Sequence, residues 1–321
     1  MTKSDPHPTR SSRPHQAYPL EAAYNPWRGL SDAHPFFENA EISAIITRAA
    51  FYAIGGIPVH FQGSAGLGKT SLALAIAQRL GRPVSFMAGN DWLGAEDMIG
   101  KEVGVTTSAV VDRYIQRVRR SESHTRQDWA PSILAEAMEQ GRTLIYDEFT
   151  RSSAKANGIL LSVLEEGILV TTNQSSARRI LQAHPEFRII LTSNPHDYAG
   201  VNSTPDALLD RMVTFSLDSY SVETRIGLVA ARTGLPLSVS ARIVRLTDAL
   251  QKQTQDANRS SLRLAILVAR IAAMRLHNGN LSDALLAQIT ADVFTGRGFG
   301  VTAAQIARLL SSEPEPQEDA A

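Results

Sequence analysis

A glycine-rich stretch has the residue types and the spacing needed to hold phosphate. Residues 63–70 read Gly-Ser-Ala-Gly-Leu-Gly-Lys-Thr and match the P-loop pattern G-x-x-x-x-G-K-[ST]. The glycines allow backbone amides to curl around phosphate oxygens, and the amides of the following helix face the same anion. Lys69 would place a positive charge on the β- and γ-phosphates, and the Thr70 hydroxyl would be a ligand of Mg²⁺. The predicted nucleotide-binding residues are Gly63, Ser64, Ala65, Gly66, Leu67, Gly68, Lys69, Thr70 and Ser71.

Two adjacent carboxylates follow an apolar run later in the chain. Residues 144–146 are Leu-Ile-Tyr and lead directly into Asp147 and Glu148. Acidic side chains at the end of a buried strand cost free energy unless a positive charge lies beside them. We expect Asp147 to hold Mg²⁺, mainly through water, and Glu148 to orient and polarise the water that attacks the γ-phosphate. The alternative for Glu148 is an acidic cap of the next helix.

Three further polar residues are candidates for the same chemistry. Asn194 ends a predicted strand, where its amide would hold the attacking water; the alternative is a turn residue, because Asn before Pro often begins a turn. Arg211 lies too far along the sheet for its own phosphates and would reach those of a neighbouring subunit, or would form an exposed pair with Asp. Arg263, at the start of a later helix, would touch the nucleotide or be an ordinary solvated residue.

The elements that must position these side chains alternate along the chain. Helical spacing at 71–80 and 156–167 separates short apolar runs, and this alternation indicates a parallel sheet covered on both faces. We therefore predict an α/β fold with a five-stranded parallel sheet flanked by helices. The predicted strands are 57–62, 83–88, 143–149, 187–194 and 212–217.

After about residue 220 the strand pattern stops and helices follow. The predicted helices are 221–233, 238–254, 261–279 and 302–310. Residues 1–35 hold six of the fifteen prolines and few aliphatic side chains, so they bury too little surface to offset the entropy of ordering. We predict four parts: a disordered proline-rich tail at 1–35, an α/β nucleotide-binding domain at 36–219, a small all-α lid domain at 220–310 and an acidic tail at 311–321.

Four aromatic residues in or beside the N-terminal tail are exceptions to its polar character. They are Tyr24, Trp27, Phe36 and Phe37. We expect them to dock onto the folded body; the alternative is a segment that binds a partner.

Composition excludes several classes of function. The chain has 321 residues, which suggests about two domains, and its 32 basic and 32 acidic residues leave no net charge that would favour DNA binding. It has no cysteine, which excludes thiol catalysis and Cys-ligated zinc. No apolar run approaches the roughly 18 residues of a membrane span, and residues 1–20 lack the apolar core of a signal peptide. We expect a cytoplasmic protein without DNA or membrane partners.

In their order along the chain, these motifs resemble an AAA+ ATPase over roughly residues 36–310. The P-loop, the Asp-Glu strand, the Ser193-Asn194 strand end, Leu-Leu-Asp-Arg at 208–211 and the helical part carry the resemblance. Residues 97–100 and 165–167 are similar to the MoxR-type branch. The resemblance implies a P-loop domain followed by a helical lid, with ATP and Mg²⁺ as ligands and a homo-oligomeric, hexameric ring.

Several stretches resemble, more specifically, MoxR-type members that act in gas vesicle assembly. They are 112–115, 146–151, 160–166, 184–188, 192–201 and 206–211. The resemblance implies that ATP hydrolysis remodels gas vesicle shell or accessory proteins, and that the ATPase is associated with gas vesicles. It also implies a pore-facing insertion within 91–130. There the arginine-rich segment 112–126 would touch an acidic client or, as we favour for most of it, form a solvated helix face.

Two other functions use the same motifs. A MoxR-type activase would mature a metalloenzyme together with a von Willebrand A domain partner, and only its client distinguishes it. A nucleotide-gated scaffold would bind ATP with negligible turnover. Glu148 argues against the scaffold, because a protein that only binds ATP does not need an acid that orients water.

Overall fold

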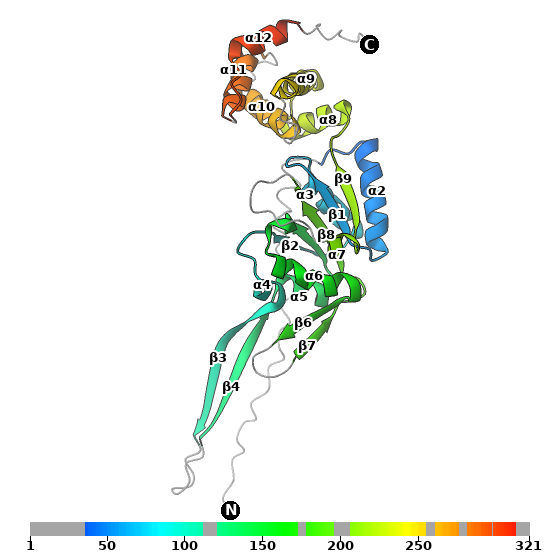
Figure 1. Cartoon of the computed structure of the whole chain (residues 1–321), viewed down its shortest axis with the longest axis vertical. Coiled ribbons are helices and arrows are strands. Elements are labelled where there is room, and N and C mark those ends of the chain that lie inside the picture. The colour runs from blue at the N-terminus through cyan, green and yellow to red at the C-terminus, as the bar shows by residue number, and fades with distance from the viewer. Residues whose placement is uncertain are drawn as a thin grey trace, which may run out of the picture. The chain divides into compact units, whose positions relative to one another are not determined.

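The structure is a computed structural model that describes residues 36–111, 121–172, 178–195, 206–254, 261–275, 281–296 and 298–312 (Figure 1). At 101–111, 121–129, 171–172 and 178–179, and at residues 254, 261 and 312, it describes the backbone alone. The predicted tails lie outside the described residues, except that the last helix includes Ser311 and Ser312. Tyr24 and Trp27 also lie outside them.

The predicted five-stranded parallel sheet is confirmed. Its strand order is β2-β5-β8-β1-β9, and every neighbouring pair is parallel. Each strand lies within its predicted run or ends one residue beyond it. The strands are β1 (Val59–Gly63), β2 (Val84–Ala88), β5 (Thr143–Asp147), β8 (Arg188–Ser193) and β9 (Val213–Leu217).

Helices cover both faces of this sheet, which explains why its strands are continuously apolar. Ile145 of β5 belongs to the apolar cluster that includes one pair of helices, whereas its neighbours Leu144 and Tyr146 belong to the cluster that includes the other pair. Successive side chains of one strand are therefore buried on opposite faces. The first pair is α2 (Ala40–Ile54) and α3 (Lys69–Leu80), and the second is α5 (Ile133–Gln140) and α6 (Ala154–Glu166).

Two antiparallel hairpins were not predicted from the sequence. Figure 1 shows a long ribbon of β3 (Gly100–Val111) and β4 (Ser121–Pro131), which follows the short helix α4 (Ala95–Ile99). A shorter hairpin joins β6 (Ile168–Thr172) to β7 (Arg178–Gln182). The preference for a helix at 112–126 is therefore wrong from residue 121 onward, while 112–120 lie outside the described residues. Strand β4 is polar, so its pairing with β3 defines it rather than an alternating apolar pattern.

The chain after β9 is helical, as predicted. Four of its helices match the predicted ranges: α8 (Val222–Thr233), α9 (Leu237–Thr254), α10 (Ser261–Arg275) and α12 (Ala303–Ser312). A further helix in this part, α11 (Asp283–Thr295), was not predicted. The short helix α7 (Asp206–Leu209) comes before β9. Buried residues of the helical region form one continuous apolar cluster with α2, α3 and the sheet. The boundary near residue 220 stays a prediction.

The segment before α2 is anchored to α8. The ring of Phe37 fills the space at Gly227, where a Cβ atom would lie 2.1 Å from the ring. Asn39 caps α2 by accepting a hydrogen bond from the amide of Ile42 at 3.0 Å, and its Nδ2 donates to Thr224 Oγ1 at 2.6 Å. The expected docking is confirmed for Phe37, whereas Phe36 is 41% exposed.

Candidate active site

The predicted site residues lie at the carboxyl ends of neighbouring parallel strands. Strand β1 leads into the P-loop, β5 ends at Asp147 and β8 ends one residue before Asn194. Because β8 pairs with both β1 and β5, all three strand ends meet at one edge of the sheet. This edge is where open α/β sheets bind ligands.

The P-loop needs glycine because of its backbone angles and its close neighbours. Gly66 has a φ of +95°, and a Cβ atom there would lie 2.7 Å from Cβ of Arg263. Gly68 has a φ of +75° at the N-cap of α3. Both angles lie in the left-handed region that residues with a side chain rarely adopt. The loop can therefore approach an anion with its backbone while α10 packs against it.

Lys69 is a buried cation inside the loop. Its Nζ donates hydrogen bonds to the carbonyl oxygens of Gly63 at 2.7 Å and Ser64 at 2.9 Å. The first turn of α3 begins at this residue, so the ammonium group and the free backbone amides of the helix occupy the same region. Both features favour a phosphate group.

Asp147 connects three elements through its carboxylate. Its Oδ1 accepts hydrogen bonds from Thr70 Oγ1 of α3 at 2.8 Å and from Thr192 Oγ1 of β8 at 2.5 Å. Thr192 Oγ1 also accepts from the amide of Glu148 at 2.9 Å. Thr192 thus fixes the position of both predicted acids, and the predicted pair of metal ligands, Thr70 and Asp147, is in direct contact.

Glu148 has a strained backbone. Its φ of +51° is the only positive φ of a residue other than glycine within the described part of the chain. Such conformations are costly and are concentrated at functional sites. The side chain is 35% exposed and forms an ion pair of 2.8 Å with Arg151 in the same turn. Glu148 lies between β5 and the 3₁₀ turn at 149–151, and its carboxylate lines the pocket.

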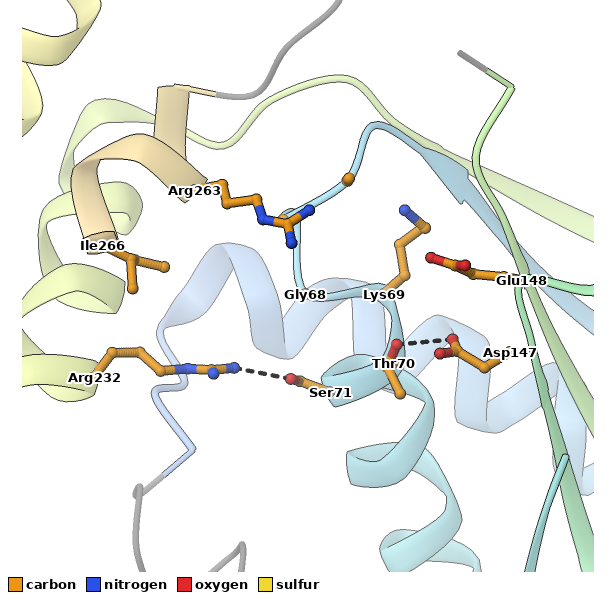
Figure 2. A pocket seen from close by; sticks show the side chains of 11 residues that line it. Gly68, Lys69, Thr70, Ser71, Asp147, Glu148, Arg232, Arg263 and Ile266 are labelled. Atoms are coloured by element: carbon orange, nitrogen blue, oxygen red, sulfur yellow. Dashed lines mark hydrogen bonds between the residues drawn. The ribbon is translucent and has the colours of Figure 1, made fainter. Parts of the chain in front are cut away.

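The pocket lies between the P-loop and the helical region and has a volume of about 330 Å³. Six predicted nucleotide-binding residues of the stretch 63–71 and both acids line it, together with three residues of the helical region: Arg232, Arg263 and Ile266. Figure 2 shows the side chain of Arg263 extending toward the loop near Gly68, and its contact with the nucleotide stays a prediction. The other three predicted nucleotide-binding residues of this stretch, Gly63, Ser64 and Leu67, do not line this pocket.

Asn194 and Arg211, the other two predicted catalytic residues, do not line the pocket. Asn194 is buried at the end of β8, two residues after Thr192. Arg211 is held by α6, because its Nη2 and Nε lie 2.6 Å and 3.0 Å from Glu165 Oε2. The ion-pair partner of Arg211 is therefore Glu165 rather than the Asp considered from the sequence. The catalytic roles of both residues stay predictions.

A buried histidine next to the site was not predicted. His60 of β1 is 1% exposed, with Nε2 at 2.8 Å from Ser193 Oγ and Nδ1 at 3.0 Å from Thr214 Oγ1. It therefore links β8 and β9 across the strand that leads into the P-loop. Burial, assisted by the positive charge of Lys69, lowers the pKa of His60 to about 4, so the ring is neutral at pH 7.

Thr192 and Arg232 were also missed. A signal for Thr192 was present: it precedes Asn194 in a predicted strand next to the one that carries Asp147. Arg232 gave no such signal, because an arginine in the last turn of an amphipathic helix is ordinary. Only the tertiary structure brings the end of α8 close to the start of α3, where Nη2 of Arg232 lies 3.0 Å from Ser71 Oγ.

The fold and these side chains define an AAA+ ATPase. Residues 58–212 match the family model of the AAA domain (dynein-related subfamily). The chain belongs to the GvpN family of gas vesicle ATPases. It is 36% identical over 274 residues to the gas vesicle ATPase GvpN of Ancylobacter aquaticus. These aligned residues cover 85% of this chain and 77% of that protein.

Two further relatives place the chain within this group. The gas vesicle ATPase GvpN of Haloferax mediterranei is 37% identical over 243 residues, with 75% of this chain and 70% of that protein covered. Protein NorQ of Paracoccus denitrificans is 23% identical over 281 residues, with 87% and 96% covered. The identity to the two GvpN proteins is thus clearly greater than the identity to NorQ.

Within the described residues, no helix combines the length and the apolar character that a membrane span requires.

Proposed function

We propose that this protein is a Mg²⁺-dependent ATPase that works as a homo-oligomeric ring and remodels partner proteins during gas vesicle assembly. One observation carries the hydrolytic part: Asp147 Oδ1 accepts hydrogen bonds from Thr70 and Thr192, and Asp147 lines the same pocket as Lys69 and Glu148. The gas vesicle part is supported by the names of the GvpN relatives.

The residues around Asp147 suit Mg²⁺. Thr70 and Asp147 offer a hydroxyl and a carboxylate oxygen, the donor types that Mg²⁺ prefers. Among the residues with described side chains, no group of three or more acidic or histidine residues could hold a metal by itself. The remaining ligands would therefore be phosphate oxygens and water, as is usual for this ion. Bound there, Mg²⁺ would neutralise charge that develops on the phosphates.

Glu148 is the residue we assign to water activation. A carboxylate that lines the pocket beside the P-loop can accept a hydrogen bond from a water molecule and polarise it for attack. The hydrogen bond from its amide to Thr192 fixes the backbone of Glu148 relative to β8. Asn194 lies two residues after Thr192 in the chain, and its side chain would hold the same water molecule from the end of β8.

Arg211 would complete the site of the next subunit. It does not line the pocket of its own chain, and its guanidinium is oriented by Glu165. An arginine supplied in trans stabilises the charge of the transition state. Hydrolysis and product release would then change the angle of the helical region, and this motion would be the output used on the client.

A mutant that binds ATP and hydrolyses it poorly can identify the client. Glu148→Gln protein is expressed in the native host and purified with and without ATP, and the proteins that copurify are identified by mass spectrometry. Lys69→Ala protein is the matched control, because it should not bind ATP. We expect gas vesicle shell or accessory proteins to be captured by Glu148→Gln only when ATP is present.

Other results would change the proposal in defined ways. Capture of a von Willebrand A domain protein together with a metalloenzyme would favour the MoxR-type activase and leave the ATPase chemistry intact. Normal gas vesicles in cells that contain only Glu148→Gln would favour the scaffold, since that function needs no hydrolysis.

A further inference from the structure

The pocket has two chemically different ends. Figure 2 shows Lys69, Asp147 and Glu148 at one end, and Arg232 with Ile266 at the other. The first end holds the groups proposed to act on the γ-phosphate and its attacking water. The second end is therefore where the rest of the nucleotide would lie.

Arg232 is a cation at this second end. It lies in the last turn of α8, and its Nη2 donates to Ser71 Oγ in the first turn of α3 at 3.0 Å. Serine is uncharged, so this bond leaves the charge of the guanidinium uncompensated. Two other arginines of the helical region differ in this respect: Arg225 pairs with Asp248, and Arg242 pairs with Asp283. Within the described part of the chain no carboxylate forms an ion pair with Arg232.

Resting on the proposed ATPase function, we infer that Arg232 is a nucleotide-binding residue that contacts the α-phosphate. A guanidinium presents several donors in one plane and is suited to phosphate oxygens. Ser71 lies two residues after Lys69 in the helix whose first-turn amides face the phosphates, so Arg232 meets the phosphate chain away from Glu148. Through Arg232, α8 would make a direct contact with the nucleotide.

This assignment has a specific kinetic consequence. ATP and ADP share the α-phosphate, so the contact is equal in substrate, transition state and product. An interaction of this kind lowers KM without raising kcat. Arg232 therefore retains nucleotide through the cycle, in contrast to groups that act on the γ-phosphate.

A charge series at position 232 tests the inference. Dissociation constants are measured by isothermal titration calorimetry for ADP and for a non-hydrolysable ATP analogue, and kcat and KM are measured for ATP. We expect Arg232→Ala to weaken both ligands by a similar factor of about 10- to 100-fold, to raise KM and to leave kcat within a factor of about three. Arg232→Lys should restore part of the affinity because it keeps the charge.

Arg232→Gln separates binding from a purely structural link between α8 and α3. An amide can still donate a hydrogen bond to Ser71 but has no charge, so we expect Gln to behave like Ala. Restoration of affinity by Gln would overturn the inference, as would an unchanged affinity in Arg232→Ala or a loss confined to the ATP analogue. The matched control is Arg242→Ala, which removes a paired arginine of the helical region outside the pocket.

The test also separates this inference from the proposed function. If Lys69→Ala leaves ATP binding intact, the P-loop assignment fails and the inference fails with it. If Lys69→Ala loses binding while Arg232→Ala does not, the ATPase site remains and only the role of Arg232 is rejected. The melting temperatures without nucleotide show whether each variant is folded.

Discussion

Thr70 and Asp147 are 77 residues apart in the chain, and a hydrogen bond of 2.8 Å joins their side chains. This bond connects the first turn of the P-loop helix to the carboxyl end of β5. Because Thr192 donates to the same carboxylate oxygen from β8, hydrogen bonds from two other elements hold the carboxylate in place. Such preorganisation lowers the cost of arranging a charged site during the reaction.

Replacing Lys69 by alanine should abolish nucleotide binding. The change removes the cation that lies inside the loop, within 2.9 Å of the carbonyl oxygens of Gly63 and Ser64. We expect the affinity for ATP and ADP to fall by at least about 100-fold, measured by calorimetry. Lys155→Ala, which alters an exposed lysine on α6, is the control. Tight binding by the Lys69 variant would exclude the P-loop assignment.

Replacing Glu148 by glutamine should separate binding from hydrolysis. The amide keeps the size of the side chain but is a poor base, so turnover should fall by about 10²- to 10⁴-fold while ATP affinity changes little. Steady-state phosphate release and calorimetry measure the two effects. Glu166→Gln, at an exposed position of α6, should leave both values unchanged. Wild-type turnover in the Glu148 variant would show that another group activates the water.

Replacing Arg211 by alanine should remove turnover and spare nucleotide binding. Arg211 does not line the pocket of its own chain, so we expect nucleotide binding to be spared and, under the proposed in-trans role, only hydrolysis in a neighbouring subunit to be affected. We expect turnover to fall by about 10³- to 10⁵-fold, measured at saturating ATP. A large loss of ATP affinity in this variant would instead indicate a role within its own subunit.

Mixing two inactive variants tests whether Arg211 acts in trans. In a mixed ring, an intact Arg211 from a Glu148→Gln subunit can face the intact Glu148 of an Arg211→Ala subunit. ATPase activity should therefore reappear when the two proteins exchange subunits. The absence of activity in rings shown to be mixed would exclude the in-trans role.

His60 should make the protein less stable in acid. The pKa of His60 is about 4 in the folded protein and near 6.5 when unfolded, so between these values the unfolded chain binds more protons. The stability of the fold therefore rises with pH across this window and falls as pH decreases from 6.5 to 4. A shift of this size corresponds to roughly 3 kcal/mol in the free energy of unfolding.

Chemical denaturation at several pH values measures this contribution. His60→Gln cannot titrate, although it is expected to be less stable at pH 7 because Ser193 and Thr214 lose good hydrogen-bond geometry. The difference in unfolding free energy between wild type and the variant should shrink as the pH falls from 6.5 to 4. A difference that stays constant would show that His60 does not titrate in this range.

Much of the α/β fold was predictable because its signals are local. Each central strand is buried on both faces, and a short apolar run such as 143–147 follows directly from that burial. The hairpin of β3 and β4 gave no comparable signal, since β4 is polar and is a strand only because β3 pairs with it. The missed helix α11 carries apolar residues on much of its surface, which obscured its period.

The P-loop pattern and the Asp-Glu pair could be recognised in the amino-acid sequence, because the residues within each motif are close together along the chain. Which distant side chains join the two motifs depends on the packing of the whole fold. Thr192 on Asp147, Arg232 on Ser71 and Glu165 on Arg211 are contacts between separate elements. Such contacts depend on strand order and helix packing, and neither can be derived from the local pattern of a single segment.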